Sequence, residues 1–199
     1  MKACLTSTPG DDRKAILRRE ALARRDALAS GERATAAITI VTRPFPVDVP
    51  PGAIVSGFIP MRSEINPIPL MQMLTSRGVK LALPVVVGKG RPLIMRAWNF
   101  DEPLQSGVWG IKEPKPGVLE VDPDILIVPL AAFDRSGHRI GYGAGYYDMT
   151  INRLRAFKPI TAIGIAFATQ EIPAVPATPR DARLDLVLTE REVIDCRGA

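Results

Sequence analysis

Between residues 53 and 87 the chain alternates between two kinds of hydrophobic pattern. AIVSGF at Ala53–Phe58 predicts a strand, PIPLMQMLTSRG at Pro67–Gly78 a helix that stops at a glycine, and VKLALPVVV at Val79–Val87 a second strand. A strand, a helix and a strand in this order form a βαβ unit, whose strands are parallel. Parallel strands are covered by helices, so this segment restricts the chain to an α/β architecture.

The rest of the chain continues the alternation. Two helices are expected before this unit, Arg13–Arg25 with an apolar stripe of Ile16, Ala23 and Leu28, and Ser30–Arg43, followed by a proline-rich connection. After it the pattern predicts strands at Leu93–Phe100, Asp124–Leu130, Ile160–Phe167 and Leu184–Thr189, and a helix at Tyr146–Phe157. We therefore expect a three-layer α/β/α sandwich with a mostly parallel central sheet, formed by residues 1–199 as a single domain with a flexible segment 1–10.

Composition excludes several classes of protein. A chain of 199 residues with 46% hydrophobic and 24% charged residues is typical of one globular domain. Its longest apolar run, ILIVPLAAF, is far shorter than the roughly 18 residues of a membrane span. The amino terminus lacks the apolar stretch of a secretory signal, and Cys4 and Cys196 form no disulfide framework. We expect a cytoplasmic protein, a monomer without membrane or nucleic-acid partners.

The segment FDRSGHRIGYGAGYYD, Phe133–Asp148, joins the buried strand to a helix. At such junctions open α/β sheets bind ligands. Its glycines, Gly137, Gly141, Gly143 and Gly145, permit positive φ and backbone N–H groups that point at phosphate oxygens; Arg135 and Arg139 add charged donors, and Asp148 stands where a carboxylate holds Mg²⁺. Glycines alone would indicate only a tight turn, and the spacing matches neither G-x-G-x-x-G nor a Walker loop. Together with the charges, they predict an anion site.

Several motifs, in their order along the chain, resemble the 5-formyltetrahydrofolate cyclo-ligase family, also called methenyltetrahydrofolate synthetases. The resemblance runs nearly end to end. The motifs are K-x-x-L-R at Lys14–Arg18, F-x-P-x-x-x-E-I at Phe58–Ile65, G-V-W-G-I-K-E-P at Gly107–Pro114, the glycine-rich segment Asp134–Asp148, and D-x-x-x-D-x-V-x-T-E at Asp181–Glu190. The glycine-rich segment is the most specific of them.

The resemblance implies ATP- and Mg²⁺-dependent conversion of 5-formyltetrahydrofolate to 5,10-methenyltetrahydrofolate, with release of ADP and phosphate. It assigns ATP binding to Lys14, Arg18, Arg139, Gly141, Tyr142, Gly143, Ala144, Gly145, Tyr146 and Tyr147. It assigns folate binding to Ile59, Glu64, Trp109, Tyr142 and Tyr146, and the metal to Asp148 and Asp181. From the residues alone, Ile59 and Trp109 would equally fit the core, Glu64 a helix cap, and Lys14 and Arg18 a solvated basic face, which is the expectation for Arg19, Arg24 and Arg25.

Two alternatives stay open from the sequence. The chain departs from the family pattern at Pro67, Ala144, Met149 and Arg180, which allows a diverged ATP-dependent enzyme acting on another formylated or carboxylate substrate. The net charge of +5 and the basic first helix also fit a non-enzymatic nucleic-acid-binding protein. The basic residues are not interleaved with aromatic residues, and no nucleic-acid motif occurs, so we favour an enzyme.

Overall fold

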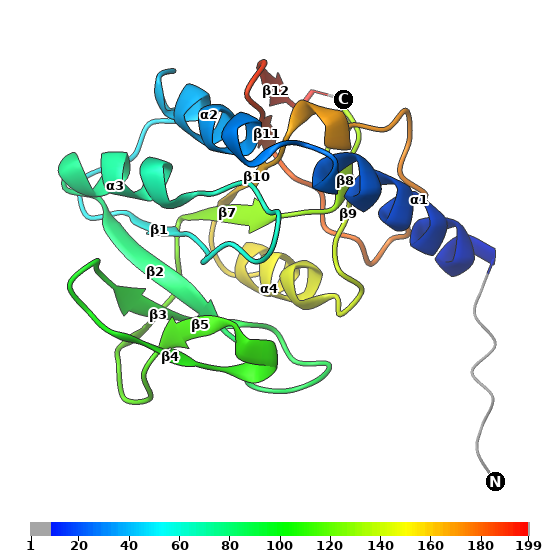
Figure 1. The fold of residues 1–199 in the computed structure, drawn as a ribbon. Helices are drawn as coiled ribbons and strands as arrows, with labels where there is room; N and C mark the ends of the chain where they lie inside the picture. Colours follow the sequence, from blue (N-terminus) through cyan, green and yellow to red (C-terminus); the bar gives the residue numbers. More distant parts are fainter. Residues whose placement is uncertain (1–8, 199) are drawn as a thin grey trace, which may run out of the picture.

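The computed structural model describes residues 9–198, in which one large sheet is surrounded by helices (Figure 1). The helices are α1 (Pro9–Asp26), α2 (Ser30–Val41), α3 (Ile68–Ser76) and α4 (Tyr146–Arg155), with single 3-10 turns η1 (Val108–Gly110) and η2 (Ala168–Gln170). The segment expected to be flexible was residues 1–10. Residues 1–8, which include Cys4, lie outside the described residues, and Pro9 and Gly10 begin α1.

The main sheet has eight strands in the order β12-β11-β10-β7-β1-β2-β3-β6. The five central strands are parallel, whereas β12, β3 and β6 pair antiparallel to their neighbours, so the sheet is mostly parallel as expected. The strand bounds are β1 Ile54–Ser56, β2 Lys80–Val85, β3 Ile94–Trp98, β6 Glu120–Val121, β7 Ile125–Pro129, β10 Thr161–Ile165, β11 Leu186–Leu188 and β12 Val193–Asp195.

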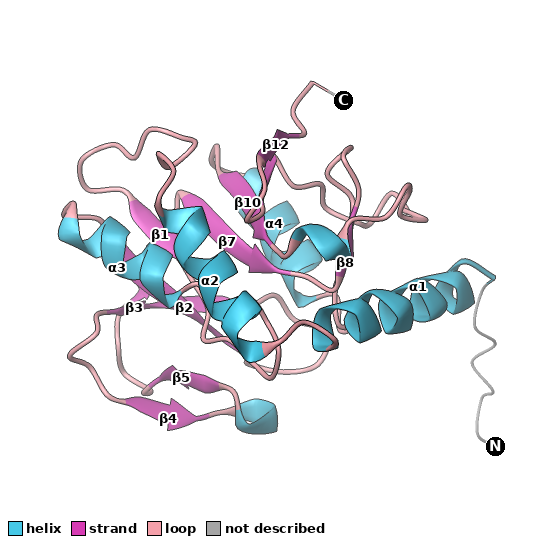
Figure 2. Cartoon of the chain, turned by 45° about the horizontal axis from the view of Figure 1, so that its top comes forward, coloured by secondary structure: helices cyan, strands magenta, loops and turns pink. Residues whose placement is uncertain are grey.

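Side chains alternate between two hydrophobic cores, one on each face of the sheet. In β7, Ile125 and Ile127 pack into a core with α2 and α3, whereas Leu126 and Val128 pack into a second core with α4. Successive side chains of a strand point to opposite faces, so a strand apolar at every position is buried on both. Figure 2 shows α2 and α3 in front of the sheet and α4 behind it, which confirms the three-layer sandwich.

The order of the strands places a topological switch point between β1 and β7. From β1 the chain crosses through α3 to β2, and from β7 through α4 to β10, on the opposite side of the strand pair and over the opposite face. Loops that leave the carboxyl ends of two such strands diverge, which opens the crevice where α/β sheets bind ligands. The loop after β1 carries residues 57–67, and the segment after β7 carries residues 130–145.

Helix α1 lies outside the two main layers and covers a small hairpin that follows β7. The hairpin strands are β8 (Ala132–Phe133) and β9 (Arg139–Ile140), and Ala132 and Ile140 pack against Ala21 and Leu17 of α1. The expected apolar stripe on α1 was therefore wrong at two positions: Ile16 is 46% exposed and Ala23 is exposed. Only Leu28 joins a core, at the edge of the one formed by α2 and α3.

A second small hairpin extends below the sheet. Its strands are β4 (Leu104–Ser106) and β5 (Lys112–Pro114), and η1 lies at its turn. Sequence patterns did not predict either hairpin. Among the described helices, we find none with the length and hydrophobicity needed to span a bilayer.

Candidate active site

The glycine-rich loop, residues 141–145, leaves the β8–β9 hairpin and leads directly into α4. Gly143 and Gly145 have φ of 98° and 69°, in the left-handed region that favours glycine, and Gly145 is the residue before the first turn of α4. Gly137 also has a positive φ, of 86°, but a Cβ there would lie 2.5 Å from the Leu184 carbonyl oxygen, so that glycine serves packing. Gly141 does not adopt the positive φ that a glycine permits.

Two cations of α1 approach this loop from one face of the helix. Lys14 Nζ donates to Asp181 Oδ2 at 2.7 Å, and Arg18 Nε donates to the Gly141 carbonyl oxygen at 2.6 Å. Residues four apart share a helical face, and the hairpin contacts of Leu17 and Ala21 turn that face towards the loop. The basic face predicted from sequence is thus partly directed at the glycine-rich loop.

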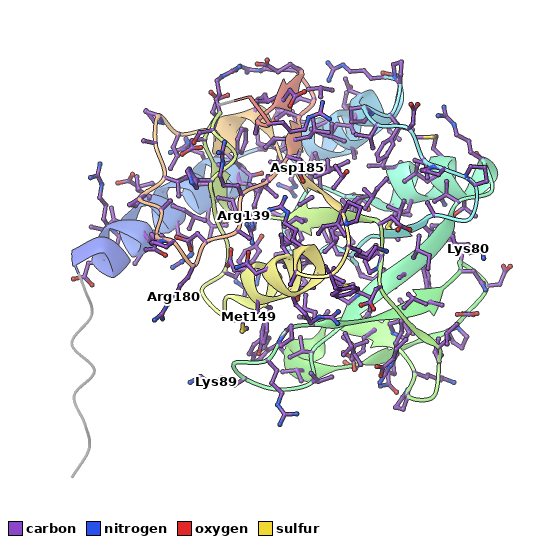
Figure 3. All side chains as sticks on the ribbon, turned by 180° about the vertical axis from the view of Figure 1, so that it is seen from behind. Lys80, Lys89, Arg139, Met149, Arg180 and Asp185 are labelled. Atoms are coloured by element: carbon purple, nitrogen blue, oxygen red, sulfur yellow. The ribbon has the colours of Figure 1, made fainter. Side chains whose placement is uncertain are left out.

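The buried Arg139 forms an ion pair with the partly exposed Asp148 at the start of α4. Arg139 is 7% exposed; its guanidinium donates to Asp148 Oδ1 at 2.8 Å and to the Ala182 carbonyl oxygen. Burial lowers the pKa of Arg139, and the charges of Asp148 and Asp181 oppose this shift. In Figure 3 Arg139 lies inside the molecule close to α4, whereas Arg180 points outwards.

Asp148 and Asp181 are positioned by adjacent backbone. The N–H of Ala182 donates to Asp148 Oδ1 at 3.0 Å, and the N–H of Thr178 donates to Asp181 Oδ2 at 2.6 Å. Burial acts to raise the pKa of Asp181, but the bonds from Lys14 and Thr178 outweigh it and lower that pKa. Both carboxylates lie near Arg139, because Asp148 accepts from its guanidinium and the charge of Asp181 acts on it.

These two carboxylates fit Mg²⁺. Mg²⁺ prefers oxygen ligands, and it is usually held by one or two carboxylates together with substrate phosphates and waters. Within residues 9–198, no group of three or more histidine, cysteine or acidic side chains forms a metal site. A two-carboxylate site completed by phosphate oxygens agrees with this donor set.

On the other side of the loop, Tyr142 connects the glycine-rich loop to the loop after β1. Its hydroxyl accepts a bond of 2.7 Å from Arg25 Nη1 and lies close enough to the Glu64 carboxylate to act on its pKa. The N–H of Met61 donates to Glu64 Oε2 at 2.7 Å, so Glu64 is oriented by its own loop. Burial raises the pKa of Glu64 even though Tyr142, Met61 and Arg25 act to lower it. Burial and the charge of Glu64 also raise the pKa of Tyr142.

Trp109 and Tyr146 provide an exposed aromatic pair near the same loop. Their ring centroids are 5.9 Å apart at an interplanar angle of 47°, and the Trp109 side chain remains 68% exposed. Trp109 has a φ of 57°, which is uncommon for a bulky residue and which turns this side chain out of η1. Ile59 is partly buried and packs at the edge of the core that contains α3, so at least part of its side chain serves the core.

The structure brings most of the candidate residues together and corrects two arginines. Arg25 was expected on the solvated face but is 3% exposed and bonded to Tyr142. Its spacing of seven from Arg18 places it on the face that carries Lys14 and Arg18, which is the sequence signal that could have identified it. Arg135, expected to bind an anion, instead pairs with Glu171 and Glu192 at 2.8 and 2.6 Å.

The departures from the family pattern lie at different depths. Pro67 directly precedes the first helical residue of α3 instead of occupying it, and Asn66 Oδ1 accepts the Ile68 N–H at 3.0 Å in the capping role. Ala144 and Arg180 are exposed, and Arg180 contributes its carbonyl oxygen to Asn152.

Tyr147 is partly buried against the α4 core, and burial raises the pKa of its hydroxyl.

Comparisons with known proteins identify the family and the fold. The model of the 5-formyltetrahydrofolate cyclo-ligase family matches residues 11–190. The 5-formyltetrahydrofolate cyclo-ligase of Mycolicibacterium smegmatis is 32% identical over 151 residues, which are 72% of this chain and 76% of that protein. The enzyme of the same name from Escherichia coli is 32% identical over 145 residues, covering 70% and 79% of the two chains. Among solved structures, 5,10-methenyltetrahydrofolate synthetase from Aquifex aeolicus matches with a TM-score of 0.76 and 26% identity over 92% of this chain and 93% of that one.

Proposed function

Because the chain belongs to the 5-formyltetrahydrofolate cyclo-ligase family of enzymes, we propose that it uses ATP and Mg²⁺ to close 5-formyltetrahydrofolate to 5,10-methenyltetrahydrofolate at the site described above. The observation that carries the proposal is the double attachment of one short segment. Arg139 at its start is bonded to Asp148, and Tyr142 three residues later is bonded to Arg25 and lies beside Glu64. Groups suited to a metal-bound polyphosphate and groups suited to a polar heterocycle therefore lie only a few residues apart.

The phosphates of ATP are bound by the cations and the glycine-rich loop in this proposal. Lys14, Arg18 and Arg139 supply charged donors, and the exposed backbone of Gly143, Ala144 and Gly145 allows close approach of phosphate oxygens. Asp148 and Asp181 hold Mg²⁺, which when bound neutralises charge on the transferring phosphoryl group. These side chains position the γ-phosphoryl group beside the folate.

Folate binding falls to the other side of the loop. Glu64 accepts an N–H from the polar edge of the pterin ring, and Trp109 with Tyr146 offers aromatic faces against which a planar ring packs. Ile59 contributes an apolar wall. Tyr142 and Tyr146 border both ligands, because Tyr142 belongs to the glycine-rich loop and lies beside Glu64, and Tyr146 follows that loop and packs against Trp109.

The chemistry explains why positioning and charge suffice. The formyl oxygen attacks the γ-phosphorus and ADP leaves, which converts a poor leaving group into a phosphate ester. N10 then attacks the formyl carbon, loses its proton, and phosphate departs with the former formyl oxygen. The product carries a conjugated amidinium between N5 and N10. Holding the reactants in line and neutralising the phosphates is the usual task of a phosphoryl-transfer site.

Product formation tests the proposal directly. Purified protein mixed with 5-formyltetrahydrofolate, ATP and Mg²⁺ should produce a near-ultraviolet absorbance that is absent when any one component is omitted, because only the closed ring has the extended conjugation. ADP should appear in equal amount. Hydrolysis of ATP without the absorbance would instead favour another formylated or carboxylate substrate. If folded protein gives neither ADP nor the absorbance, the enzymatic role is rejected.

A further inference from the structure

We propose that Arg25 is a positioning residue for folate binding, which acts by fixing the hydroxyl of Tyr142 so that its proton points at Glu64. This inference rests on the proposed function, since it assumes that Glu64 accepts from the substrate. It adds a residue from the carboxyl end of α1 to the folate side, whose other proposed residues come from loops, η1 and the start of α4.

Arg25 is placed unusually for an arginine. It is 3% exposed, although burying a cation without a close carboxylate is costly. Its nearest carboxylate, that of Asp26, lies 3.9 Å away on a side chain that is 62% exposed. The close partners are hydroxyl groups: Arg25 Nη1 donates to Tyr142 Oη at 2.7 Å and Nε donates to Ser63 Oγ at 3.0 Å.

The direction of these hydrogen bonds follows from what each group can do. A guanidinium has donors and no acceptor, so the Tyr142 oxygen must accept from Arg25. The Tyr142 proton is then free to point at Glu64, which as a carboxylate can only accept. Arg25 therefore imposes one direction on the chain of bonds from Arg25 to Tyr142 to Glu64.

The ring of Tyr142 is held as well as its hydroxyl. Arg25 Cζ lies 5.9 Å from the centroid of the Tyr142 ring, within the range of a cation–π interaction. The ring is 44% exposed and belongs to the glycine-rich loop, whose backbone restricts it little. Without Arg25, the hydroxyl could rotate away from Glu64 and the ring could leave its place.

Ser63 gives the same arginine a second arm. Ser63 precedes Glu64 in the loop after β1, and its hydroxyl accepts from Arg25 while donating to Asp26. This arm ties the loop to α1 without involving Tyr142. A purely structural role for Arg25 would depend on both arms, whereas positioning of Glu64 depends on the Tyr142 arm.

A double-mutant cycle separates the two roles. Binding of 5-formyltetrahydrofolate is measured by calorimetry without ATP in Arg25→Met, Tyr142→Phe and the double variant, and binding of ATP with Mg²⁺ is measured separately. We expect Arg25→Met to raise the folate dissociation constant by roughly tenfold and to leave the ATP constant unchanged. In the Tyr142→Phe background, Arg25→Met should have less than about a twofold further effect, because both variants break the same chain.

The controls use neighbours of Arg25. Arg24→Met changes an exposed arginine bonded to the Thr169 carbonyl oxygen and should leave folate binding unchanged. Ser63→Ala removes the second arm and should also leave it near the wild-type value. If Arg25→Met does not fold, Arg25→Lys replaces it in the cycle, with an expected loss of about threefold that again disappears with Tyr142→Phe.

The outcomes are decisive for Arg25 independently of the reaction. Effects of Arg25→Met and Tyr142→Phe that multiply fully, or equal losses of folate and ATP affinity, would overturn the positioning role and leave Arg25 a structural residue. The proposed function fails by a different result, a wild-type protein that binds folate but forms no closed product.

Discussion

The two sides of the site differ in how their charges are arranged before ligands arrive. On the nucleotide side, two of the three proposed phosphate-binding cations already pair with the proposed metal ligands, Lys14 with Asp181 and Arg139 with Asp148. On the folate side, Glu64 accepts from the Met61 N–H and lies beside Tyr142, and it forms no ion pair with any described residue.

This difference suggests different modes of binding. Mg²⁺ and polyphosphate arriving together can exchange both ion pairs at once, since the phosphates take the cations and the metal takes the carboxylates. Polyphosphate alone would take the two cations and leave both carboxylates without a partner, and Mg²⁺ alone would take the carboxylates and leave both cations without one. The folate side needs no exchange, because its acceptor is already oriented, and a preorganised site loses less free energy on binding. We expect ATP affinity to depend steeply on Mg²⁺ and folate affinity to be independent of it.

Arg139→Met should produce the largest effect. It leaves Asp148 without its buried partner, and breaking such a pair costs about 3 kcal/mol in the free energy of unfolding, while turnover should fall at least about 100-fold. Urea denaturation and steady-state kinetics measure the two losses. Arg135→Met, on the same segment but paired at the surface with Glu171 and Glu192, should change both little. Similar losses in the two variants would show that Arg139 acts only by holding its segment in place.

Asp148→Asn should separate the two sides of the site most cleanly. The amide retains the shape and can still accept from the Ala182 N–H, but it loses the charge that holds Mg²⁺. We expect turnover to fall about 100-fold and to need higher Mg²⁺, with folate binding unchanged in calorimetry. Asp181→Asn should behave in the same way, more mildly. Wild-type activity of both variants at limiting Mg²⁺ would reject the metal assignment.

Lys14→Ala and Arg18→Ala test the cations of α1. Loss of a charge-assisted bond to phosphate weakens binding by about 1.5 to 3 kcal/mol, so we expect the KM for ATP to rise by roughly tenfold or more in each. Arg24→Ala, at an exposed arginine six residues beyond Arg18 in the same helix, is the matched control and should leave this constant unchanged. The same rise in all three variants would mean that the helix acts through its overall charge.

Much of the fold follows from local pattern, and the errors mark where distant segments decide. The central strands and all four helices were predicted within a few residues. Burial on both faces gives β7 a continuous apolar run, and burial of one side gives α3 a helical period of apolar residues. Strands β6 and β12 and the two hairpins were missed, since stretches of two or three residues become strands only through their pairing partners.

The candidate site shows the same division. Its residue types followed from the resemblance, and its place from the junction of strand and helix. In the helix RKAILRREALARR only the spacing of seven from Arg18 distinguishes Arg25 from Arg24. The partners that bury Arg25, Ser63 and Tyr142, lie 38 and 117 residues away and cannot be inferred from the helix. Arg135 was misassigned for the matching reason that Glu171 and Glu192 reach it from other segments.

Trp109→Ala should give a smaller, one-sided effect. The side chain is 68% exposed, so its removal should hardly change the free energy of unfolding, while loss of a stacking surface of about 1 kcal/mol should weaken folate binding about fivefold. Calorimetry with each ligand measures both constants, and ATP binding should not change. Leu119→Ala, at a 71% exposed leucine, is the control. A weaker ATP constant in Trp109→Ala would place this tryptophan on the nucleotide side.

The smallest predicted effect compares the carboxylate of Glu64, proposed to bind folate, with that of Asp124, which serves only structure. Burial raises the pKa of Glu64, so above its unfolded-state pKa the ionised side chain costs stability, and this cost is relieved as the pH falls. Asp124 has the opposite sign. Burial opposes it, but bonds from Lys158 and the Ile54 N–H lower its pKa, so its contribution is present above the unfolded-state pKa and is lost as the pH falls through the folded one. Thermal unfolding at pH 7 should therefore show a slightly higher Tm for Glu64→Gln than for the wild type, and a lower Tm for Asp124→Asn. The Glu64→Gln difference should shrink as the pH falls towards the unfolded-state pKa of 4.5, and the Asp124→Asn difference only as the pH falls below 3.8. A lower Tm for Glu64→Gln at pH 7 would mean that the folate side holds its acceptor without any cost in stability.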